Sequence, residues 1–382
     1  MKSIRKLGLR FERAYRRQRW LLRQKHCRQV RDHWIEFAST LKPPSAHLPT
    51  CLLDLHDIDL DGEQGRRFHQ LVSLLTHGGY TIYLNPRLSF LQTAHRAFKA
   101  EALRKVRPLS HLTRPPVFDL YLTDRMPTSD IAEQTMIVTA DQTRPIGERE
   151  LPLPYGPFPS VWNEDWERDL GSHRKTPRTW RLFFGGHCSE ASYTKIRKYE
   201  RMAVLNRFQV VETTKHHFAS DIAPIQNDRS FKQLLSMEHD GFVFLDNGIY
   251  RTPAGEWLTL LARSRFFLAA PGGDYPLSHN LVESMAVGTI PVIEYASLMT
   301  PPLEDGVNCI HYEGKAGLRE SLQRVRSMNE MEIERLQEGV IDYYESHLTS
   351  RAFVQAIETG LYDCVHMMPY LTPERQQRLV AA

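Results

Sequence analysis

The hydrophobic and polar positions of the first half of the chain predict strands that alternate with helices. Short apolar runs indicate strands at residues 51–55, 80–84, 117–123 and 135–140. Residues 63–79 have helical spacing and stop at a Gly-Gly pair, and residues 90–105 are again helical. Strands that alternate with helices in this way predict a parallel sheet with helices on its faces.

A second alternation follows residues 143–179, which are rich in Pro, Gly and aromatic side chains. Apolar runs indicate strands at residues 181–186, 208–213, 241–246, 265–271, 289–294 and 308–313. Helical spacing is found at residues 192–206, 256–264, 279–288, 315–327, 330–347 and 349–361. The chain therefore repeats its first pattern, which predicts a second domain of the same class.

We expect an α/β protein with two doubly wound, Rossmann-like domains that face a cleft. The expected parts are a basic amphipathic N-terminal helix (1–45), an N-terminal domain (46–150), a linker (151–180), a C-terminal domain (181–348) and a C-terminal helix that crosses back (349–382). In open α/β sheets, ligands bind beyond the carboxyl ends of the strands. The loops that follow the strands are therefore the places to search for chemistry.

The positive charge of the chain is concentrated at its start. Residues 1–31 hold twelve Lys or Arg and one acidic residue, Glu12, so their net charge is +11 while the rest of the chain sums to −7. Apolar residues recur among these cations near helical spacing, a pattern that suits an anionic membrane surface. The alternatives are a helix that packs its apolar stripe on the protein, or contact with another protein or a nucleic acid. We expect no nucleic-acid partner.

The cysteines and the hydropathy favour a cytoplasmic protein. The five cysteines are isolated and show no CxxC spacing, which argues against a disulfide framework and a structural zinc site. No apolar run approaches the roughly 20 residues that a membrane-spanning helix needs. We expect a cytoplasmic location, with the basic tail as a means of peripheral attachment to the inner membrane face.

The stretch PGGDYPLSHNLVESMAVGTIPVI (271–293) combines a Gly-rich turn, a helix start and one acidic residue between two apolar runs. Gly272 and Gly273 would let backbone N–H groups approach a ligand closely. Ser278 suits the N-cap of a helix whose N-terminus would attract phosphate, and Glu283 could accept hydrogen bonds from a diol. The alternative is a plain strand–turn–helix unit, with Ser278 as a cap and Glu283 exposed.

This stretch resembles the donor-site segment of exostosin-type glycosyltransferases and their GT-B relatives. The matching positions are Ser278, Leu281, Glu283 and the run GTIPVI. The resemblance implies that the segment holds a nucleotide-sugar, with Glu283 near the ribose. The family usually has Arg before the Leu, where this chain has Asn280 with His279 beside it. Retaining GT-B enzymes have a second glutamate eight residues earlier, where this chain has Tyr275, so the resemblance implies an inverting enzyme.

A second segment, RLFFGGHCSEASYTKIRKYERM (181–202), resembles the strand, turn and Arg-bearing helix of the same family. Gly185 and Gly186 would let the backbone meet a diphosphate. Arg197 and Lys198 would supply cations near it, and Arg suits bidentate phosphate contact. The alternative is a solvated basic helix face.

An inverting reaction needs a base for the acceptor hydroxyl. The loop DLHDIDLDGE (54–63) follows the first predicted strand, and we choose His56 or Asp57 as the base. The alternative is a polar loop that caps the next helix. DID and DLD also resemble the metal-binding DxD of GT-A enzymes, but the two-domain alternation fits GT-B, in which helix dipoles and cations replace the metal. We therefore expect neither a metal nor a cofactor.

These observations predict an inverting glycosyltransferase that moves a sugar from a nucleotide-sugar to a saccharide or lipid-linked acceptor, in polysaccharide or glycoconjugate biosynthesis. The alternative is a non-catalytic, degenerate GT-B protein that binds a partner or a membrane through its basic tail. Another nucleotide-sugar enzyme, such as an epimerase, would need GxGxxG after the first strand, which the loop lacks.

Overall fold

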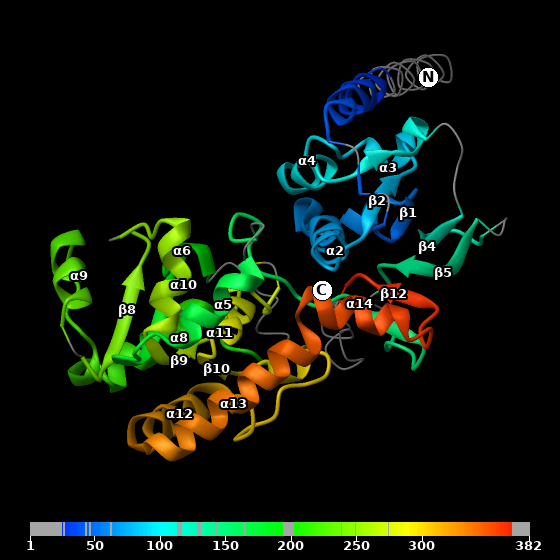
Figure 1. Cartoon of the computed structure of the whole chain (residues 1–382). Coiled ribbons are helices and arrows are strands. Elements are labelled where there is room, and N and C mark those ends of the chain that lie inside the picture. Colours follow the sequence, from blue (N-terminus) through cyan, green and yellow to red (C-terminus); the bar gives the residue numbers. More distant parts are fainter. Residues whose placement is uncertain are drawn as a thin grey trace, which may run out of the picture. The chain divides into compact units, whose positions relative to one another are not determined.

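The chain forms two compact units (Figure 1). The computed structural model describes residue 25 and residues 27–368, except 43, 46, 62, 113–116, 128–130, 142–143, 163–165, 194–201, 238, 249 and 274. Unit 1 holds the described residues up to Asp141, together with Ile146–Leu153 and Val354–Met368. Unit 2 holds the described residues of Gln142–Pro145 and Pro154–Phe353. Most of the expected N-terminal helix, residues 1–24, lies outside the described residues.

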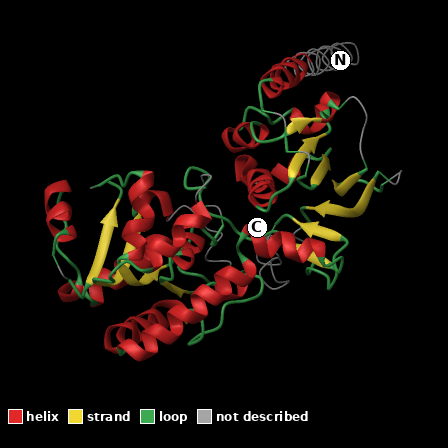
Figure 2. Cartoon of the chain, viewed as in Figure 1, coloured by secondary structure: helices red, strands yellow, loops and turns green. Residues whose placement is uncertain are grey.

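Unit 1 is built on a seven-stranded parallel sheet, here called sheet A (Figure 2). Its strands are β1 (Thr50–Asp54), β2 (Thr81–Leu84), β3 (Arg107–Pro108), β4 (Phe118–Thr123), β5 (Ala132–Thr139), β6 (Glu150–Pro152) and β12 (Cys364–His366). Their order is β3-β2-β1-β4-β5-β12-β6, with parallel pairing throughout. β1 is buried along nearly its whole length because Cys51, Leu52 and Leu53 are apolar on both faces of the sheet.

The helices of unit 1 cover this sheet and join its strands. They are the helix over residues 27–39, α2 (Arg66–His77), α3 (Leu88–Leu91), α4 (Ala97–Leu103) and α14 (Ser350–Glu358), with 3-10 turns η1 (Ile58–Asp61), η2 (Glu63–Gly65) and η3 (Leu109–His111). α14 carries the chain from unit 2 into unit 1, where β12 inserts between β5 and β6. The sequence pattern predicts this returning helix but no strand at residues 364–366, because three residues are too few to show a period.

Unit 2 contains a five-stranded parallel sheet, here called sheet B. Its strands are β7 (Trp180–Gly186), β8 (Phe242–Asp246), β9 (Ser264–Leu268), β10 (Ile290–Ile293) and β11 (Ile310–His311), in the order β11-β10-β9-β7-β8. The chain therefore leaves β7 toward β8 on one side and later returns to β9 on the other side. Right-handed crossovers in opposite directions place their helices on opposite faces, as in other doubly wound sheets.

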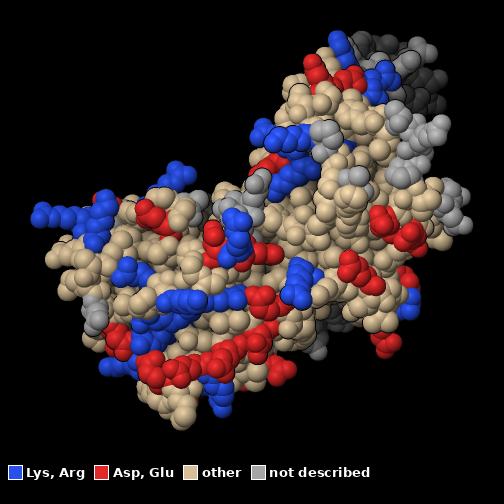
Figure 3. Space-filling model, viewed as in Figure 1, with Lys and Arg blue, Asp and Glu red and all other residues tan. Residues whose placement is uncertain are grey.

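Two groups of helices pack on sheet B. The helices of unit 2 are α5 (Trp166–Arg174), α6 (Glu190–Tyr193), α8 (Arg207–His217), α9 (Asp228–Leu235), α10 (Ala254–Ala262), α11 (His279–Ala286), α12 (Gly314–Ser327) and α13 (Glu330–His347), with 3-10 turns η4 (Ala219–Asp221) and η5 (Ala296–Leu298). α8 and α12 pack together beside β7, while α5, α10, α11 and α13 pack around β9 and β10. Exposed acidic side chains follow one another along α13 (Figure 3).

The structure confirms two doubly wound α/β domains, but one predicted strand is wrong. Residues 208–213 belong to helix α8. A capping box starts this helix, because the Asn206 side chain accepts from the Gln209 N–H and the Gln209 side chain accepts from the Asn206 N–H. Val210 and Val211 bury their side chains on one face of the helix. The β-branched run of Val and Thr is therefore overridden by the cap and by packing.

Two further stretches differ from the sequence pattern. Within the expected linker, the residues from Pro154 onward belong to unit 2 and include α5. The helix expected at residues 192–206 is described only as the short α6, and residues 194–201 lie outside the described part. Among the described residues, no helix is long and apolar enough to span a membrane.

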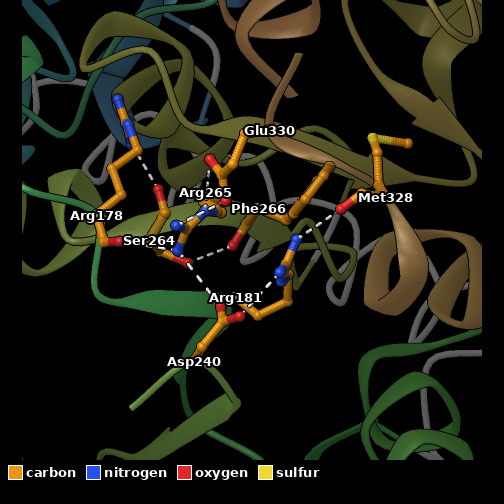
Figure 4. A network of polar contacts seen from close by, with 8 residues as sticks. All are labelled: Arg178, Arg181, Asp240, Ser264, Arg265, Phe266, Met328 and Glu330. Atoms are coloured by element: carbon orange, nitrogen blue, oxygen red, sulfur yellow. Dashed lines mark hydrogen bonds and ion pairs between the residues drawn. The ribbon is translucent and has the colours of Figure 1, made fainter. Parts of the chain in front are cut away.

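A half-buried arginine, Arg178, lies at the amino-terminal edge of sheet B (Figure 4). The Arg178 guanidinium donates hydrogen bonds to the Ser264 carbonyl, to Thr289 Oγ1 at 2.9 Å and to the Val287 carbonyl at 2.6 Å. These acceptors belong to the starts of β9 and β10 and to the end of α11. Burial and the nearby Arg265 lower the pKa of Arg178 to about 10, so it stays charged at neutral pH.

A second layer of the same network lies nearer the solvent (Figure 4). Asp240 accepts from Arg181 at 2.8 Å and from Arg265 at 3.3 Å, and Arg265 also pairs with Glu330 at 2.9 Å. Arg181 further donates to the Met328 carbonyl at 3.1 Å. The network thus joins the starts of β7 and β9 to the turn between α12 and α13. The polar interactions at this edge are therefore structural.

We predict that Arg178→Met destabilises unit 2 by about 3 kcal/mol, because buried carbonyl groups lose their donors. Denaturant unfolding measures the change. Arg335→Met, at an exposed position on α13, is the matched control and should differ little from the wild type. Equal unfolding midpoints for the two variants would show that the hydrogen bonds of Arg178 do not stabilise unit 2.

Candidate functional site

The strand order of sheet B places a topological switch point between β7 and β9, its first and third strands. At such a point the chain leaves neighbouring strands in opposite directions, which opens a crevice at their carboxyl ends. β7 ends at Gly185 and Gly186, and β9 leads into the loop with Gly272 and Gly273. The two glycine pairs, which are separated in the sequence, therefore meet at one edge of one sheet.

Gly185 is required by packing. A Cβ atom at this position would lie 2.7 Å from the Trp257 ring, which comes from α10. The next residue, Gly186, has a φ of 154°, which other residues rarely adopt, and a Cβ there would lie 3.1 Å from Arg207 Nη1. The end of β7 is therefore pressed between an aromatic ring and a guanidinium group.

Arg207 brings a cation to this edge, and the sequence analysis missed it. It is the first residue of α8, and its Nε donates to the Pro271 carbonyl at 2.9 Å. Its guanidinium also lies 5.2 Å from the ring centroid of Tyr193. Arg207 thus bridges the end of β7 and the loop after β9. The available signal was Asn206 with Gln209, a helix-start pattern, but the sequence analysis places Asn206 at the end of a helix and Gln209 in a strand.

The loop after β9 turns sharply at Gly272. Its N–H donates to the Pro276 carbonyl at 3.1 Å, and a Cβ atom would lie 2.6 Å from the Tyr275 carbonyl oxygen. No heavy atom would lie within 4 Å of a Cβ at Gly273. The loop therefore needs glycine at position 272 for close approach, while position 273 is open.

Ser278 precedes α11 with the extended backbone of an N-cap residue, but its side chain makes no capping hydrogen bond. The residue is 6% exposed, and its Oγ has no hydrogen-bond partner among the described residues. The expected cap is therefore absent. A buried hydroxyl without a partner, beside the unsatisfied N–H groups of a helix start, suits an anion or a sugar phosphate.

The first residues of α11 face neighbouring elements of unit 2. The His279 ring packs against Phe158, with 5.0 Å between the centroids. Asn280 Nδ2 approaches the Gly185 carbonyl at 3.5 Å, a long contact. The position where the family resemblance expected a cation therefore touches the end of β7, and Arg207 brings a cation to the same edge from another helix.

Glu283 is completely buried, and its carboxylate binds two groups of unit 2. Oε1 accepts from the Phe158 N–H at 2.7 Å, and Oε2 accepts from the Trp257 indole N–H at 2.6 Å. The alternative of an exposed Glu283 is wrong. Its predicted role as a ribose ligand stays a prediction. In this arrangement Glu283 holds the Trp257 ring over Gly185.

The predicted cations Arg197 and Lys198 lie outside the described residues. Among the described residues, no group of three or more His, Cys, Asp or Glu side chains could hold a metal ion.

In unit 1, the switch point of sheet A lies between β1 and β4, and Asp54 lies at its centre. Arg87 donates to both oxygens of Asp54, at 2.7 and 2.9 Å, and the Tyr121 hydroxyl donates at 3.2 Å. His56 Nε2 lies 3.5 Å from Asp54 Oδ1. Burial alone would raise the pKa of Asp54, but the hydrogen bonds and charge of Arg87 outweigh it, so the pKa lies below its ordinary value. Asp54 is therefore a carboxylate that faces an imidazole.

The two base candidates of this loop have different surroundings. Asp124 accepts from the backbone N–H groups of His56, at 3.0 Å, and of Asp57, at 2.7 Å, and this fixes the loop after β1. The Asp57 carboxylate accepts from the Asp59 N–H at 2.9 Å, as in a local turn. The geometry therefore favours His56 over Asp57 as a base, because His56 has an acidic partner that orients it.

The far end of the same loop has a structural role. Asp61 is fully buried and pairs with Lys99 Nζ at 2.7 Å, and Thr93 also donates to it. Burial lowers the pKa of Lys99 to about 8, although Asp61 opposes this change. Lys99 Nζ also lies 3.2 Å from the Phe90 ring centroid. The acidic loop thus divides into a half at the sheet edge and a half that anchors α4.

Comparison with known proteins finds no family model and no curated protein that match this chain. Among solved structures, it is similar to AviGT4, a glycosyltransferase involved in avilamycin A biosynthesis, at 11% identity over 88% of this chain and 99% of that one, with a TM-score of 0.40. It is similar to a glycosyltransferase from Rickettsia africae at 8% identity over 82% and 98%, with a TM-score of 0.42. It is also similar to HepE of Anabaena in complex with UDP, at 10% identity over 82% and 99%, with a TM-score of 0.36. At these scores the similarities assign neither an activity nor a ligand to this chain.

We predict that Glu283→Gln destabilises unit 2 by about 2 kcal/mol, because the amide NH₂ would oppose one of the two buried N–H donors. The tryptophan emission should also change as the Trp257 indole loses a charged acceptor. Glu338→Gln, exposed on α13, is the control for removal of a negative charge. If Glu283→Gln were as stable as the wild type, the hydrogen bonds that this carboxylate accepts would not stabilise unit 2.

Proposed function

We propose that this protein is a GT-B glycosyltransferase of exostosin-like type that binds a nucleotide-sugar at the switch point of sheet B. The observation that carries the proposal is the buried hydroxyl of Ser278 at the start of α11, which has no hydrogen-bond partner among the described residues, with Arg207 and Gly186 at the same edge. Helix N-terminus, cation and glycine turn are the three features that bind a diphosphate in α/β proteins. The resemblance of residues 271–293 supports the same assignment.

In the proposed arrangement, the diphosphate lies against the first turn of α11 and the Arg207 guanidinium. Backbone N–H groups and a fixed cation would stabilise the negative charge that develops as the nucleoside diphosphate leaves. This site needs no metal for that purpose, because its positive charge comes from the protein. Trp257, held by Glu283, would form the wall behind Gly185.

We assign the base of an inverting transfer to His56. With Nε2 facing Asp54, the imidazole would take the proton of the acceptor hydroxyl on Nδ1. The hydroxyl oxygen forms a bond to the anomeric carbon while the bond from that carbon to the nucleoside diphosphate breaks. Asp54, kept ionised by Arg87, would stabilise the resulting imidazolium. The acceptor is proposed to be a saccharide or a lipid-linked sugar, and the location the inner membrane face.

One observation favours a second candidate, a degenerate protein that binds nucleotide without transfer. Asn280 replaces the expected Arg, and the Glu283 carboxylate is engaged inside unit 2. Such a protein would bind a partner or a membrane through its basic tail. Nucleotide binding without sugar hydrolysis or transfer would favour this candidate.

We predict that a nucleoside diphosphate, tested as UDP, GDP or CDP, raises the thermal unfolding temperature of the protein. Arg207→Ala should weaken the binding about tenfold or more, because a charge-assisted phosphate contact is lost. Arg229→Ala, exposed on α9, is the control. No shift with any of the three nucleotides would overturn the proposed donor site.

We further predict that His56→Ala lowers the transfer rate about 10²–10⁴-fold while nucleotide binding is unchanged, since His56 belongs to unit 1. Screening with a panel of nucleotide-sugars and measuring the released nucleoside diphosphate provides the assay. Asp57→Ala should retain most of the rate. Equal losses in both variants would argue for a loop that is needed only for folding.

A further inference from the structure

An apolar groove in unit 1 shares none of its lining residues with the switch point of sheet A. It has a volume of about 710 Å³ and lies between the helix over residues 27–39 and the region of α4. Its apolar walls are formed by Val30, Trp34, Phe37, Ala94, Ala100 and Leu103. The described surface of unit 1 therefore has a continuous apolar hollow, and hollows of this kind mark binding sites.

The groove has a firm floor. The Trp34 indole N–H donates to the Leu103 carbonyl at 2.7 Å, which fixes the helix to the end of α4. Cys27 and Ala38 are buried on the same helix, so its inner face packs on unit 1. Phe37 is 37% exposed, and Val30 and Ala100 are half-buried, so apolar surface remains open above this floor.

Charged side chains border the apolar surface, and the basic ones lie toward its N-terminal end. Arg104 lines the groove, Arg28 is exposed on the helix over residues 27–39 and Lys25 is exposed just before it, while Asp32 and Glu36 are exposed farther along the helix. Basic and acidic side chains are both visible in this region in Figure 3. The chain reaches this helix directly from residues 1–24, which hold nine Lys or Arg and one acidic residue. The groove is therefore next to the most basic part of the sequence.

We propose that this groove takes an acyl chain of an anionic phospholipid when the protein lies on a membrane. An apolar hollow with basic side chains at its N-terminal end, preceded in the sequence by a polybasic segment, matches an amphiphile with an apolar chain and an anionic headgroup. A single buried chain gives only marginal membrane binding, and stable attachment needs a second signal such as a polybasic segment. The groove and the basic tail supply these two signals from adjacent parts of the chain.

Brominated acyl chains test this contact, because bromine quenches the fluorescence only of tryptophans that it approaches closely. The full chain is mixed with vesicles of phosphatidylglycerol or of phosphatidylcholine, each with brominated chains. We expect phosphatidylglycerol to bind and to quench the emission. Trp20 lies in the basic tail and would be quenched there as well, so Trp34→Phe is compared in a Trp20→Phe background, where it should remove most of the remaining quenching.

Filling the groove should weaken binding. Ala100→Phe should reduce affinity for phosphatidylglycerol vesicles about tenfold, because the lost burial corresponds to that of an apolar side chain. Ala97→Phe is the matched control, since it adds the same ring at an exposed position of the same helix outside the groove. Co-sedimentation and circular dichroism report binding and folding separately.

Three outcomes would overturn the proposal. Binding that high salt abolishes and Ala100→Phe leaves unchanged would indicate surface electrostatics alone. A concentration-dependent dimer that Ala100→Phe abolishes would assign the groove to a second copy of the chain. Absence of binding to either vesicle would exclude a lipid. None of these measurements depends on sugar transfer, so they leave the proposed enzyme activity untouched.

Discussion

The carboxylate of Glu283 is the interaction on which the candidate donor site depends. A buried carboxylate is costly unless donors satisfy both of its oxygens. Here the donors are the backbone of Phe158 and the indole of Trp257, which belong to two different parts of unit 2. Because Trp257 in turn covers Gly185, the position of one acidic side chain determines the shape of the sheet edge at β7.

The two edges of sheet B differ in how fully their polar groups are hydrogen-bonded. At the amino-terminal edge, arginines are saturated by carbonyl groups and by the shared carboxylate of Asp240. At the carboxyl edge, the Ser278 hydroxyl has no hydrogen-bond partner in the part of the chain that the structure describes, and Arg207 donates one hydrogen bond to the Pro271 carbonyl. A protein edge with unsatisfied polar groups is less stable by itself, and such incompletely satisfied places are where ligands bind.

Unit 1 shows a related division within one loop. Asp54 and His56 lie side by side at the edge of sheet A, while Asp61 anchors the loop from inside through Lys99. Similar residues spaced a few positions apart thus receive different roles. The difference comes from burial, since Asp61 is fully enclosed and the side chain of His56 is 26% exposed.

The sequence by itself determined the class of fold and the location of the glycine turns, because strand and helix periods are local properties. It failed at residues 208–213, where a capping box and packing outweighed the β propensity of Val and Thr, and Arg207 was missed with them. Only the tertiary structure decided that Glu283 points inward, that Arg207 joins the loop after β9, and that His56 faces Asp54. The contacts of Glu283 and Arg207 join groups that are more than twenty residues apart in the sequence. The position of His56 beside Asp54 depends on Arg87 and Asp124, which follow other strands and fix this loop. No local pattern records such distant contacts.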